Sequence, residues 1–440
     1  MPSRCFSRLL LSSLFCLCLG TPLARAQDAL VLPSSTGAQA ETDEYTRYEL
    51  LDPATNSFKI YYEVTATTAG ARFFYNPIRK GSIASDESVF DAMTGAPLPF
   101  SVVSGVEALR DPLMSRAATD TDYIKVTLAR PVPEHGQGRV LILKTYKDAK
   151  SYHTEGNAIV FDRPLGIRRN KVVLPPGYEV LSLSVPSQIL TEPDGRVAIS
   201  FMHAGSGEAP LVLKATRDAQ TGAAARPHTP SQKPSWEAPF PGIPEKERLS
   251  ERAHGDRDIV YFLQQPETHA FSLYHDYTES RPGINSYVNV VRSGSKVDHP
   301  SAYILDTGEA LQPKLMTGAE IKAAGMDPGD PIEDKSSAVV FSFAPVQAGH
   351  SLRLRIAETY TAPASYRLEG DELVFDRSLG RPRNAVVLPS GWYCTASATP
   401  ATVEQLPDGR VRLDLWDDQP EPVDVLLKAR RRVTNTGPRP

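Results

Sequence analysis

The sequence is poor in cysteine, and after its first residues it lacks long hydrophobic runs and blocks of basic residues. Only four cysteines occur in 440 residues, and three of them lie before residue 19. If export removes that segment, Cys394 alone remains and no internal disulfide can form. No later apolar run approaches the length of a membrane-spanning helix. A formal charge of −4 without Lys/Arg blocks argues against nucleic acid as the main partner.

The first 26 residues have the pattern of a secretory signal peptide. Arg4 and Arg8 precede an apolar run at residues 9–20, and Ala-Arg-Ala follows at residues 24–26. The run is too short to span a bilayer core of about 30 Å. We therefore expect cleavage after Ala26 and a secreted or periplasmic mature chain.

Helical patterns are scarce, whereas short alternating segments are frequent. The chain contains 38 prolines, and proline breaks helix interiors. Residues 57–66 (SFKIYYEVTA) alternate with period two and are rich in β-branched and aromatic residues, as a half-buried strand requires. One convincing helical stretch occurs, at residues 318–325, with Thr317 as its N-cap. These features predict an all-β protein of antiparallel β-sandwiches, with one large or two small sandwiches per repeat.

The chain repeats itself with a period of about 213 residues. After a one-residue shift, residues 151–178 match residues 365–392 over a VFDR motif and a Val-Val-Leu-Pro segment. The sequence therefore predicts a tandem duplication of an antiparallel β-sandwich-like domain joined by a proline-rich linker. The expected boundaries are a signal peptide at 1–26, repeat 1 at 45–218, the linker at 219–255 and repeat 2 at 256–432.

Two resemblances arise from these repeated segments. PVPEHGQGRVLILKTYK (131–147) and PVQAGHSLRLRIAETYT (345–361) resemble part of the N-terminal all-β domain of M1-type metallopeptidases. The repeat as a whole also resembles segments of uncharacterised secreted bacterial proteins with a VFDR…RPRNAVVLP signature. The first resemblance implies a β scaffold without the catalytic domain, and the second implies no activity.

Motifs of several enzyme classes are absent from the sequence. There is no His-Glu-x-x-His zinc motif, no Gly-x-Ser-x-Gly nucleophile motif and no phosphate-binding glycine loop. None of the nine histidines has a partner at the spacing of a compact zinc site. We expect no cofactor, no metal and no catalytic residues. Cys394 fits a small buried hydrophobe better than a catalytic thiol, and the acidic loop at 327–334 fits a solvated loop better than a calcium site.

Polar residues that persist in both repeats are the main candidates for a site. One interpretation is structural: an Asp–Arg network closes the sheet ends, with arginines bonded to loop carbonyls. The alternative is an anion or carboxylate site in each repeat. We favour the structural interpretation, because retention in both copies suits a fold requirement better than a unique active site. The pairs are Asn76/Asn289, Arg79/Arg292, Asp162/Asp376, Arg163/Arg377, Arg169/Arg383 and Asn170/Asn384.

The leading functional hypothesis is a secreted, non-catalytic binding or envelope scaffold protein whose partner is a periplasmic or extracellular protein or glycan. One alternative is a β-sandwich hydrolase or lyase acting on an extracellular polymer, with carboxylates or a Tyr/Arg/Asn group as acid and base. Another is a non-catalytic accessory of an exported peptidase. A deep pocket in which several titratable groups converge is the observation that discriminates between the hydrolase or lyase and the non-catalytic binding or scaffold protein.

Overall fold

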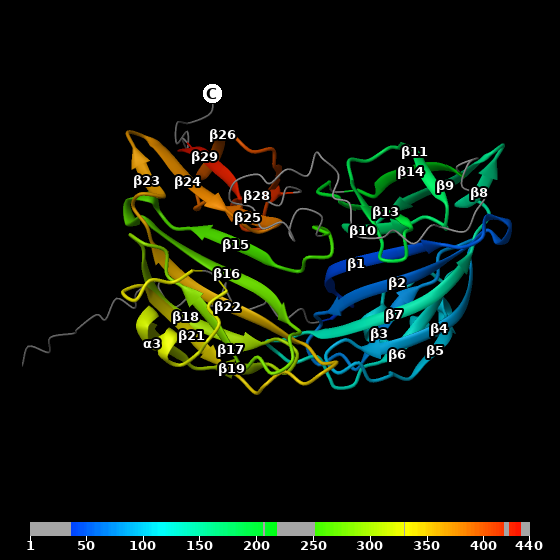
Figure 1. Ribbon diagram of the computed structural model, residues 1–440, viewed down its shortest axis with the longest axis horizontal. Coiled ribbons are helices and arrows are strands. Elements are labelled where there is room, and N and C mark those ends of the chain that lie inside the picture. The colour runs from blue at the N-terminus through cyan, green and yellow to red at the C-terminus, as the bar shows by residue number, and fades with distance from the viewer. Residues whose placement is uncertain (1–36, 206, 218–250, 330, 418–421, 433–440) are drawn as a thin grey trace, which may run out of the picture.

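The computed structural model describes residues 37–205, 207–217, 251–329, 331–417 and 422–432. The predicted signal peptide and residues 219–250 of the predicted linker lie outside the described residues. Nearly all regular structure is strand, and the two repeats lie side by side (Figure 1). Within the described residues, no helix has the length and apolar character needed to cross a membrane.

The elements of repeat 1 follow the alternating segments of the sequence. Its strands are β1 (Glu41–Leu50), β2 (Ser57–Ala66), β3 (Phe73–Pro77), β4 (Ile83–Asp91), β5 (Phe100–Ser104), β6 (Asp122–Thr127), β7 (Gly138–Lys147), β8 (Tyr152–Glu155), β9 (Ala158–Leu165), β10 (Arg169–Val173), β11 (Tyr178–Leu183), β12 (Gln188–Thr191), β13 (Val197–Met202) and β14 (Ala209–Arg217). Its helical turns are η1 (Pro53–Thr55), α2 (Gly105–Ala108) and η2 (Pro112–Met114).

Repeat 2 has the same succession of elements. Its strands are β15 (Asp258–Leu263), β16 (Ala270–Glu279), β17 (Ser286–Val290), β18 (Lys296–Ile304), β19 (Glu309–Leu311), β20 (Pro313–Thr317), β21 (Ser337–Ser342), β22 (Leu352–Thr361), β23 (Tyr366–Glu369), β24 (Glu372–Leu379), β25 (Arg383–Val387), β26 (Trp392–Ser397), β27 (Thr402–Gln405), β28 (Val411–Trp416) and β29 (Val423–Arg431). Its helical pieces are η4 (Pro266–Thr268) and α3 (Gly318–Ala323). The predicted α3 begins with a capping box between Thr317 and Glu320.

Each repeat contains one large sheet and two small ones. The large sheets have the orders β12-β13-β10-β1-β2-β7-β4 and β27-β28-β25-β15-β16-β22-β18-β19, which correspond strand for strand except for β19. The four-stranded sheets are β11-β14-β9-β8 and β26-β29-β24-β23, and the three-stranded sheets are β3-β6-β5 and β17-β21-β20. The structure thus confirms the all-β class and the two similar halves. It adds one parallel pair per repeat, β1 with β10 and β15 with β25.

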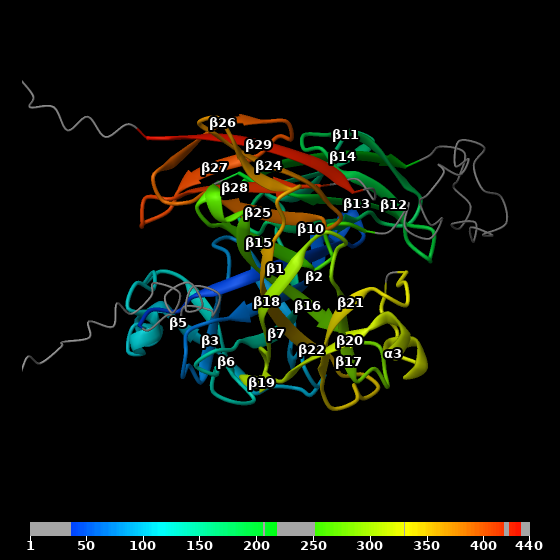
Figure 2. The ribbon, with the colours of Figure 1, turned by 90° about the vertical axis from the view of Figure 1, so that its left-hand side faces the viewer.

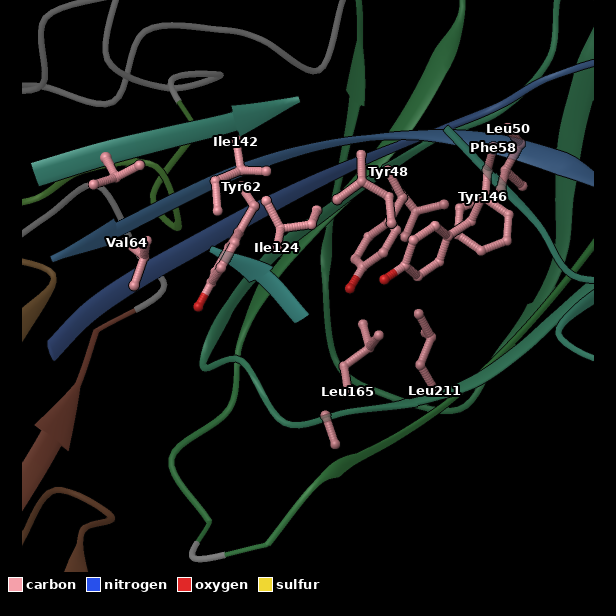
Figure 3. Packing of buried hydrophobic residues seen from close by; sticks show 14 of the residues in the cluster. Tyr48, Leu50, Phe58, Tyr62, Val64, Ile124, Ile142, Tyr146, Leu165 and Leu211 are labelled. Atoms are coloured by element: carbon pink, nitrogen blue, oxygen red, sulfur yellow. The ribbon is translucent and has the colours of Figure 1, made fainter. Parts of the chain in front are cut away.

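Both small sheets cover the same face of the large sheet. In Figure 2 the four-stranded sheets lie at the top of both repeats and the three-stranded sheets at the bottom. In β2, Phe58, Ile60, Tyr62 and Val64 are buried at alternate positions, so their side chains share one face. In repeat 1 these side chains and those of both small sheets form one continuous core, part of which is shown in Figure 3. One long sheet faced by two short ones in each repeat is consistent with the predicted tandem β-sandwich.

The core of repeat 2 is divided. One cluster joins the four-stranded sheet to β15, β25 and β28, and a second joins β18 and β22 to the three-stranded sheet. Half-buried Val291 and Val297 touch both clusters. The division matters because the candidate site described below lies at this seam.

Polar contacts, rather than a shared apolar core, join the two repeats. Arg139 forms a bidentate pair with Asp306, at 2.6 Å from Nε to Oδ1 and 3.1 Å from Nη2 to Oδ2. Asp306 is fully buried. The backbone amide of Gln137 donates to the carbonyl oxygen of Leu305 at 2.7 Å. Each repeat therefore buries its own apolar residues, and the junction is specified by charge and hydrogen bonds.

The described end of the predicted linker lies against repeat 1. Glu251 accepts hydrogen bonds from Lys171 (2.6 Å), from the Tyr45 hydroxyl (2.8 Å) and from Ser200 (3.0 Å). Residues 251–255 are therefore anchored before the chain enters β15. This contact further fixes the position of repeat 2 on repeat 1.

Because the apolar clusters do not cross the junction, we predict that each repeat folds alone. Fragments 37–218 and 256–432, which include all strands of each repeat, should each show a cooperative thermal transition by circular dichroism. The full chain serves as the control. Two unfolded fragments beside a folded full chain would show that the junction is required for folding and that the repeats are not independent domains.

Candidate functional site

Arg79 and Arg292 make the same structural bond in the two repeats. The Arg79 guanidinium donates to the carbonyl oxygen of Pro164 at 2.9 Å, and Arg292 donates to the equivalent carbonyl of Ser378 at 3.2 Å. Each arginine ties the loop after the first strand of the three-stranded sheet to the end of a strand in the four-stranded sheet. This contact accounts for the retention of the pair and confirms the predicted bonding of arginines to carbonyl oxygens.

Asn170 and Asn384 also have one shared structural role. Their side-chain amides donate to the carbonyl oxygens of Ile167 (2.6 Å) and Arg381 (2.7 Å), three residues earlier in each chain segment. Both asparagines are buried at the start of β10 and β25. They close the tight turn that leads into the parallel strand of each large sheet.

Arg169 and Arg383 bind backbone carbonyls next to the junction of the repeats. Arg169 Nη1 lies 3.1 Å from the carbonyl oxygen of Ala253 and 3.2 Å from that of His254. Arg383 Nη2 donates to the carbonyl oxygen of Asp256 at 3.0 Å. In both repeats this arginine therefore hydrogen-bonds backbone carbonyls of the segment that leads into β15.

Asp162 and Asp376 do not join Arg163 and Arg377 in the predicted Asp–Arg network. Both aspartates are exposed, whereas Arg163 is buried. Neighbouring residues of a strand point to opposite faces of the sheet, so adjacent side chains cannot pair across it. The aspartates face solvent and take no part in the site.

Arg163 is instead neutralised by a residue that the comparison of repeats did not indicate. Its Nη1 lies 3.1 Å from Asp148 Oδ2 and 3.3 Å from the hydroxyl of Ser151. Its guanidinium also lies against the rings of Phe58 (5.3 Å) and Tyr146 (5.6 Å). Although burial opposes ionisation, hydrogen bonds from Ser151 and the charge of Arg163 hold the pKa of Asp148 below its usual value.

In repeat 2 the corresponding arginine has lost its carboxylate. Ala362 occupies the position equivalent to Asp148. Arg377 keeps the aromatic surroundings, with Phe271 at 5.3 Å and Tyr360 at 6.0 Å from its guanidinium carbon. Its Nε and Nη1 atoms are buried and have no hydrogen-bond partner among the described residues. Arg377 therefore presents two unsatisfied donors in a place where repeat 1 has an internal ion pair.

A second buried position carries opposite charges in the two repeats. Lys144 of β7 donates to Asn76 Oδ1 at 2.5 Å, whereas at the equivalent place in β22 Glu358 accepts from Asn289 Nδ2 at 2.6 Å. A side-chain amide can donate or accept, so one retained asparagine suits both partners. Asn289 also donates to the Tyr360 hydroxyl at 3.2 Å. The asparagine is therefore present in both repeats because it hydrogen-bonds whichever charged residue, Lys144 or Glu358, lies beside it.

Burial shifts both of these charged groups toward neutrality. Desolvation, with the nearby charge of Arg163 adding to it, lowers the pKa of Lys144 to about 7. Desolvation raises the pKa of Glu358 to about 7, against hydrogen bonds from Asn289 and Tyr360 that favour its ionised form. The Oε1 atom of Glu358 is buried and has no partner in the described part of the chain. The sequence did not indicate Lys144 or Glu358 as site residues. Only residues identical in the two repeats were candidates, and these two equivalent positions carry opposite charges.

Arg377, Asn289 and Glu358 all line a pocket of about 390 Å³ at the seam of the repeat 2 core. Two lining residues differ from their buried counterparts in repeat 1: His275 stands in place of Tyr62, and Tyr287 in place of Phe74. His275 Nδ1 lies 3.1 Å from the Tyr287 hydroxyl, and burial holds the pKa of His275 well below its usual value. The other lining residues are Ile259, Tyr261, Leu273, Val290, Arg292, Ile356, Tyr360, Ser378, Leu379, Gly380 and Arg381.

Two larger hollows are present, and only the first adjoins this pocket. One of about 580 Å³ shares Tyr287, Asn289 and Arg381 with the pocket and extends toward Arg257 and Arg281. The other, of about 640 Å³, lies between the repeats and is lined by several arginines and carboxylates. In that cleft Arg355 and Asp276 form a buried bidentate pair at 2.7 Å, so part of its charge is already neutralised.

The remaining candidates for chemistry do not converge on a site. Over the described ranges, no three His, Cys, Asp or Glu side chains are grouped so that they could hold a metal ion. Cys394 is half-buried, and burial raises the pKa of its thiol, which disfavours the reactive thiolate. In the acidic loop, Asp327 accepts a hydrogen bond from Arg281 at 2.9 Å.

Comparison with known proteins gives similarity of fold only. No family model matches the sequence, and a search of curated proteins found no match. Among solved structures, the chain is similar to the M1 zinc metallopeptidase from Deinococcus radiodurans, at 13% identity and a TM-score of 0.28 over 42% of this chain and 44% of that chain. The chain thus spans less than half of the M1 chain that it matches.

Two further similar structures are of proteins that are not described as peptidases. A putative nutrient binding protein from Legionella pneumophila matches at 10% identity and a TM-score of 0.24, over 42% of this chain and 68% of that chain. The collagen adhesin from S. aureus matches at 9% identity and a TM-score of 0.14, over 78% of this chain and 86% of that chain. These comparisons are consistent with the M1-like strand motifs of the sequence and carry no conclusion about activity.

The two equivalent arginines should respond differently to removal of their charge. Arg163→Met leaves buried Asp148 without its cation and should lower the free energy of unfolding by about 3–5 kcal/mol. Arg377→Met leaves no carboxylate unpaired. It should change the free energy of unfolding by less than about 1 kcal/mol. Thermal and urea unfolding of both variants measure the difference. Equal losses would show that Arg377 is as structural as Arg163.

The buried Lys144 and Glu358 should give opposite dependences of stability on pH. The pKa of Glu358 is raised on folding, so its contribution is fully present below its usual pKa near 4.5 and is lost as the pH rises through about 7. Glu358→Gln should therefore gain stability relative to the parent chain between pH 5 and pH 8.5, by up to about 3 kcal/mol.

The pKa of Lys144 is lowered on folding, so its contribution is lost as the pH falls from its usual pKa near 10.5 through about 7. Lys144→Met should gain stability relative to the parent chain as the pH falls over that range. Melting temperatures at pH 5.5, 7 and 8.5 test both signs. A parallel pH dependence of the two variants would contradict the burial of these charges.

Proposed function

We propose that this protein is an exported, non-catalytic binding protein in which repeat 1 is mainly a scaffold and repeat 2 carries the binding pocket. The observation that carries the proposal is the difference between equivalent places in the two repeats. Repeat 1 has a continuous core and a paired Arg163. Repeat 2 has a divided core, a pocket of about 390 Å³ and the unpaired donors of Arg377. A pocket of this size is sufficient for a small ligand or for one group of a larger one.

The junction between the repeats supports a single body rather than two loosely linked modules. The buried Arg139–Asp306 pair and the contacts of Glu251 cross it at hydrogen-bond distance. A fixed arrangement lowers the conformational entropy lost on binding, because the binding surfaces are already in place. Repeat 1 thereby contributes to binding by holding repeat 2 in a fixed position.

The cellular place of this activity follows from the predicted signal peptide. We propose that the mature chain begins at Gln27 and works in the periplasm or outside the cell, with a small molecule, glycan or protein of that compartment as its partner. Arg4, Arg8 and the Ala-Arg-Ala motif at residues 24–26 support this proposal.

We expect that the pocket becomes smaller when repeat 2 receives the larger residue that repeat 1 has at the equivalent position. His275→Tyr restores the side chain of Tyr62 and should fill part of the pocket. In a thermal-shift screen of small polar, apolar and charged organic molecules, hits with the full chain should disappear in His275→Tyr. They should persist in Tyr62→Phe, the matched change in repeat 1. Hits that are insensitive to His275→Tyr would place binding elsewhere and overturn the proposal.

An enzyme acting on an extracellular polymer is a second candidate, favoured by one observation. Glu358, with a pKa near 7, lies beside Asn289 and within the same pocket as Tyr360, a group able to hold and move a proton. The binding proposal predicts no release of reducing or unsaturated ends from polygalacturonate or alginate. Turnover that Glu358→Gln abolishes would establish the enzyme instead.

A further inference from the structure

The carboxylate of Asp148 occupies a small polar cradle in repeat 1. Its Oδ2 atom accepts hydrogen bonds from the hydroxyls of Ser82 (3.0 Å) and Ser151 (2.7 Å) and from Arg163 Nη1 (3.1 Å). Two hydroxyl donors and one guanidinium are thus directed at one carboxylate. Such charge-assisted hydrogen bonds are roughly twice as strong as neutral ones.

Repeat 2 keeps the donors of this cradle and has lost the carboxylate. Ser295, Ser365 and Arg377 occupy the positions of Ser82, Ser151 and Arg163, but Ala362 replaces the aspartate. An alanine methyl group cannot accept hydrogen bonds, so Arg377 has no carboxylate at this position. Arg377 hydrogen-bonds the side chain of Tyr261, and its Nε and Nη1 atoms are without a partner among the described residues.

The backbone around the cradle is unchanged between the repeats. The amide of Ser365 donates to the carbonyl oxygen of Ala362 at 2.9 Å, as Ser151 does to Asp148 at 3.2 Å. The amide of Asp376 donates to the carbonyl oxygen of Ser365 at 2.8 Å, and the equivalent bond of repeat 1 has the same length. Ser365 is half-buried, whereas Ser151 is buried, and Ala362 is buried like Asp148.

We propose that Arg377, which lines the repeat 2 pocket, binds the carboxylate of an external ligand, whereas its counterpart Arg163 is paired internally with Asp148. This inference rests on the proposed binding function of the repeat 2 pocket and names the chemistry that it recognises. The unpaired Nε and Nη1 atoms of Arg377 can bind two carboxylate oxygens in the parallel geometry that a guanidinium favours.

The walls of the pocket define the rest of the ligand. Leu273, Ile356 and Leu379 supply apolar surface, and Tyr261 and Tyr360 supply aromatic rings. A volume of about 390 Å³ lies at the lower end of the range for small-molecule sites. The fitting ligand is therefore an organic acid with an apolar or aromatic body. A small, strongly hydrated inorganic anion would leave these walls unused.

Glu358 supports a carboxylate at this place under mildly acidic conditions. Because burial raises its pKa to about 7, Glu358 is mostly neutral at pH 6 and does not compete for the Arg377 guanidinium. Its neutral side chain can also donate a hydrogen bond to a ligand oxygen from the unpartnered Oε1.

Isothermal titration of the full chain at pH 6 tests the inference with defined probes. Hexanoate and benzoate should bind, and hexanamide and benzamide, which keep the apolar body without the charge, should bind at least about tenfold more weakly. Inorganic phosphate is the arm that separates recognition of an organic carboxylate from binding of any anion. Phosphate that binds as tightly as hexanoate would overturn the assignment of an organic acid.

Ala362→Asp is the decisive variant, because it gives repeat 2 the internal carboxylate of repeat 1. It should lower the affinity for hexanoate at least about tenfold while the melting temperature stays the same or rises. Arg377→Met should have the same effect on binding. Asp376→Ala changes the adjacent exposed residue and should leave binding unchanged.

The outcomes separate this inference from the proposed function. Acids and amides that bind equally, and lose binding in His275→Tyr, would leave the pocket as the binding site but reject carboxylate recognition. Unchanged binding of hexanoate to Ala362→Asp, with a melting temperature at or above that of the parent chain, would likewise reject it. No binding of any probe, together with no hit in the thermal-shift screen that depends on His275, would reject both.

Discussion

Each repeat holds a guanidinium among aromatic rings, at the place where the large sheet meets the four-stranded sheet. The need to satisfy this charged group constrains the residues around it in both repeats. Arg163 and Arg377 both lie about 5.3 Å from an equivalent phenylalanine ring of the large sheet. A buried cation requires a nearby anion or a set of hydrogen-bond acceptors. Repeat 1 meets this requirement internally with Asp148, and repeat 2 meets it only in part through the faces of its aromatic rings.

Duplication explains how one fold can tolerate both solutions. The bonds that hold loops and turns, from Arg79 and Arg292 and from Asn170 and Asn384, are the same in both copies. With this frame retained, the second copy has His275 in place of Tyr62 and no counterpart of the Arg163–Asp148 ion pair, and its sheets are still formed. The second copy still has two separate apolar clusters to stabilise it. The structural interpretation therefore describes these four residues, and Arg377 is the member of the set for which we propose a binding role.

The junction of the repeats follows a different physical rule from their interiors. Inside each repeat, apolar side chains at alternate strand positions form the core. Between the repeats, the fully buried Asp306 accepts hydrogen bonds from the Arg139 guanidinium. Glu251 accepts hydrogen bonds from three side chains of repeat 1. Directional bonds of this kind fix orientation more sharply than apolar contact, since removal of one partner leaves the other buried and unsatisfied.

The sequence by itself determined the all-β class, the duplication, the single well-capped helix and the bonding of Arg79, Arg292 and Arg383 to carbonyl oxygens, because these depend on local periodicity and on identities between copies. It did not identify Asp148, Lys144 or Glu358, which differ between the repeats and are brought to the retained residues by strand pairing far along the chain. It also placed Asp162 and Asp376 in an Asp–Arg network, although a strand turns them to the face opposite to Arg163 and Arg377. Only the tertiary structure decided that two short sheets share one face of a long sheet. That arrangement creates the seam where the second repeat opens into a pocket.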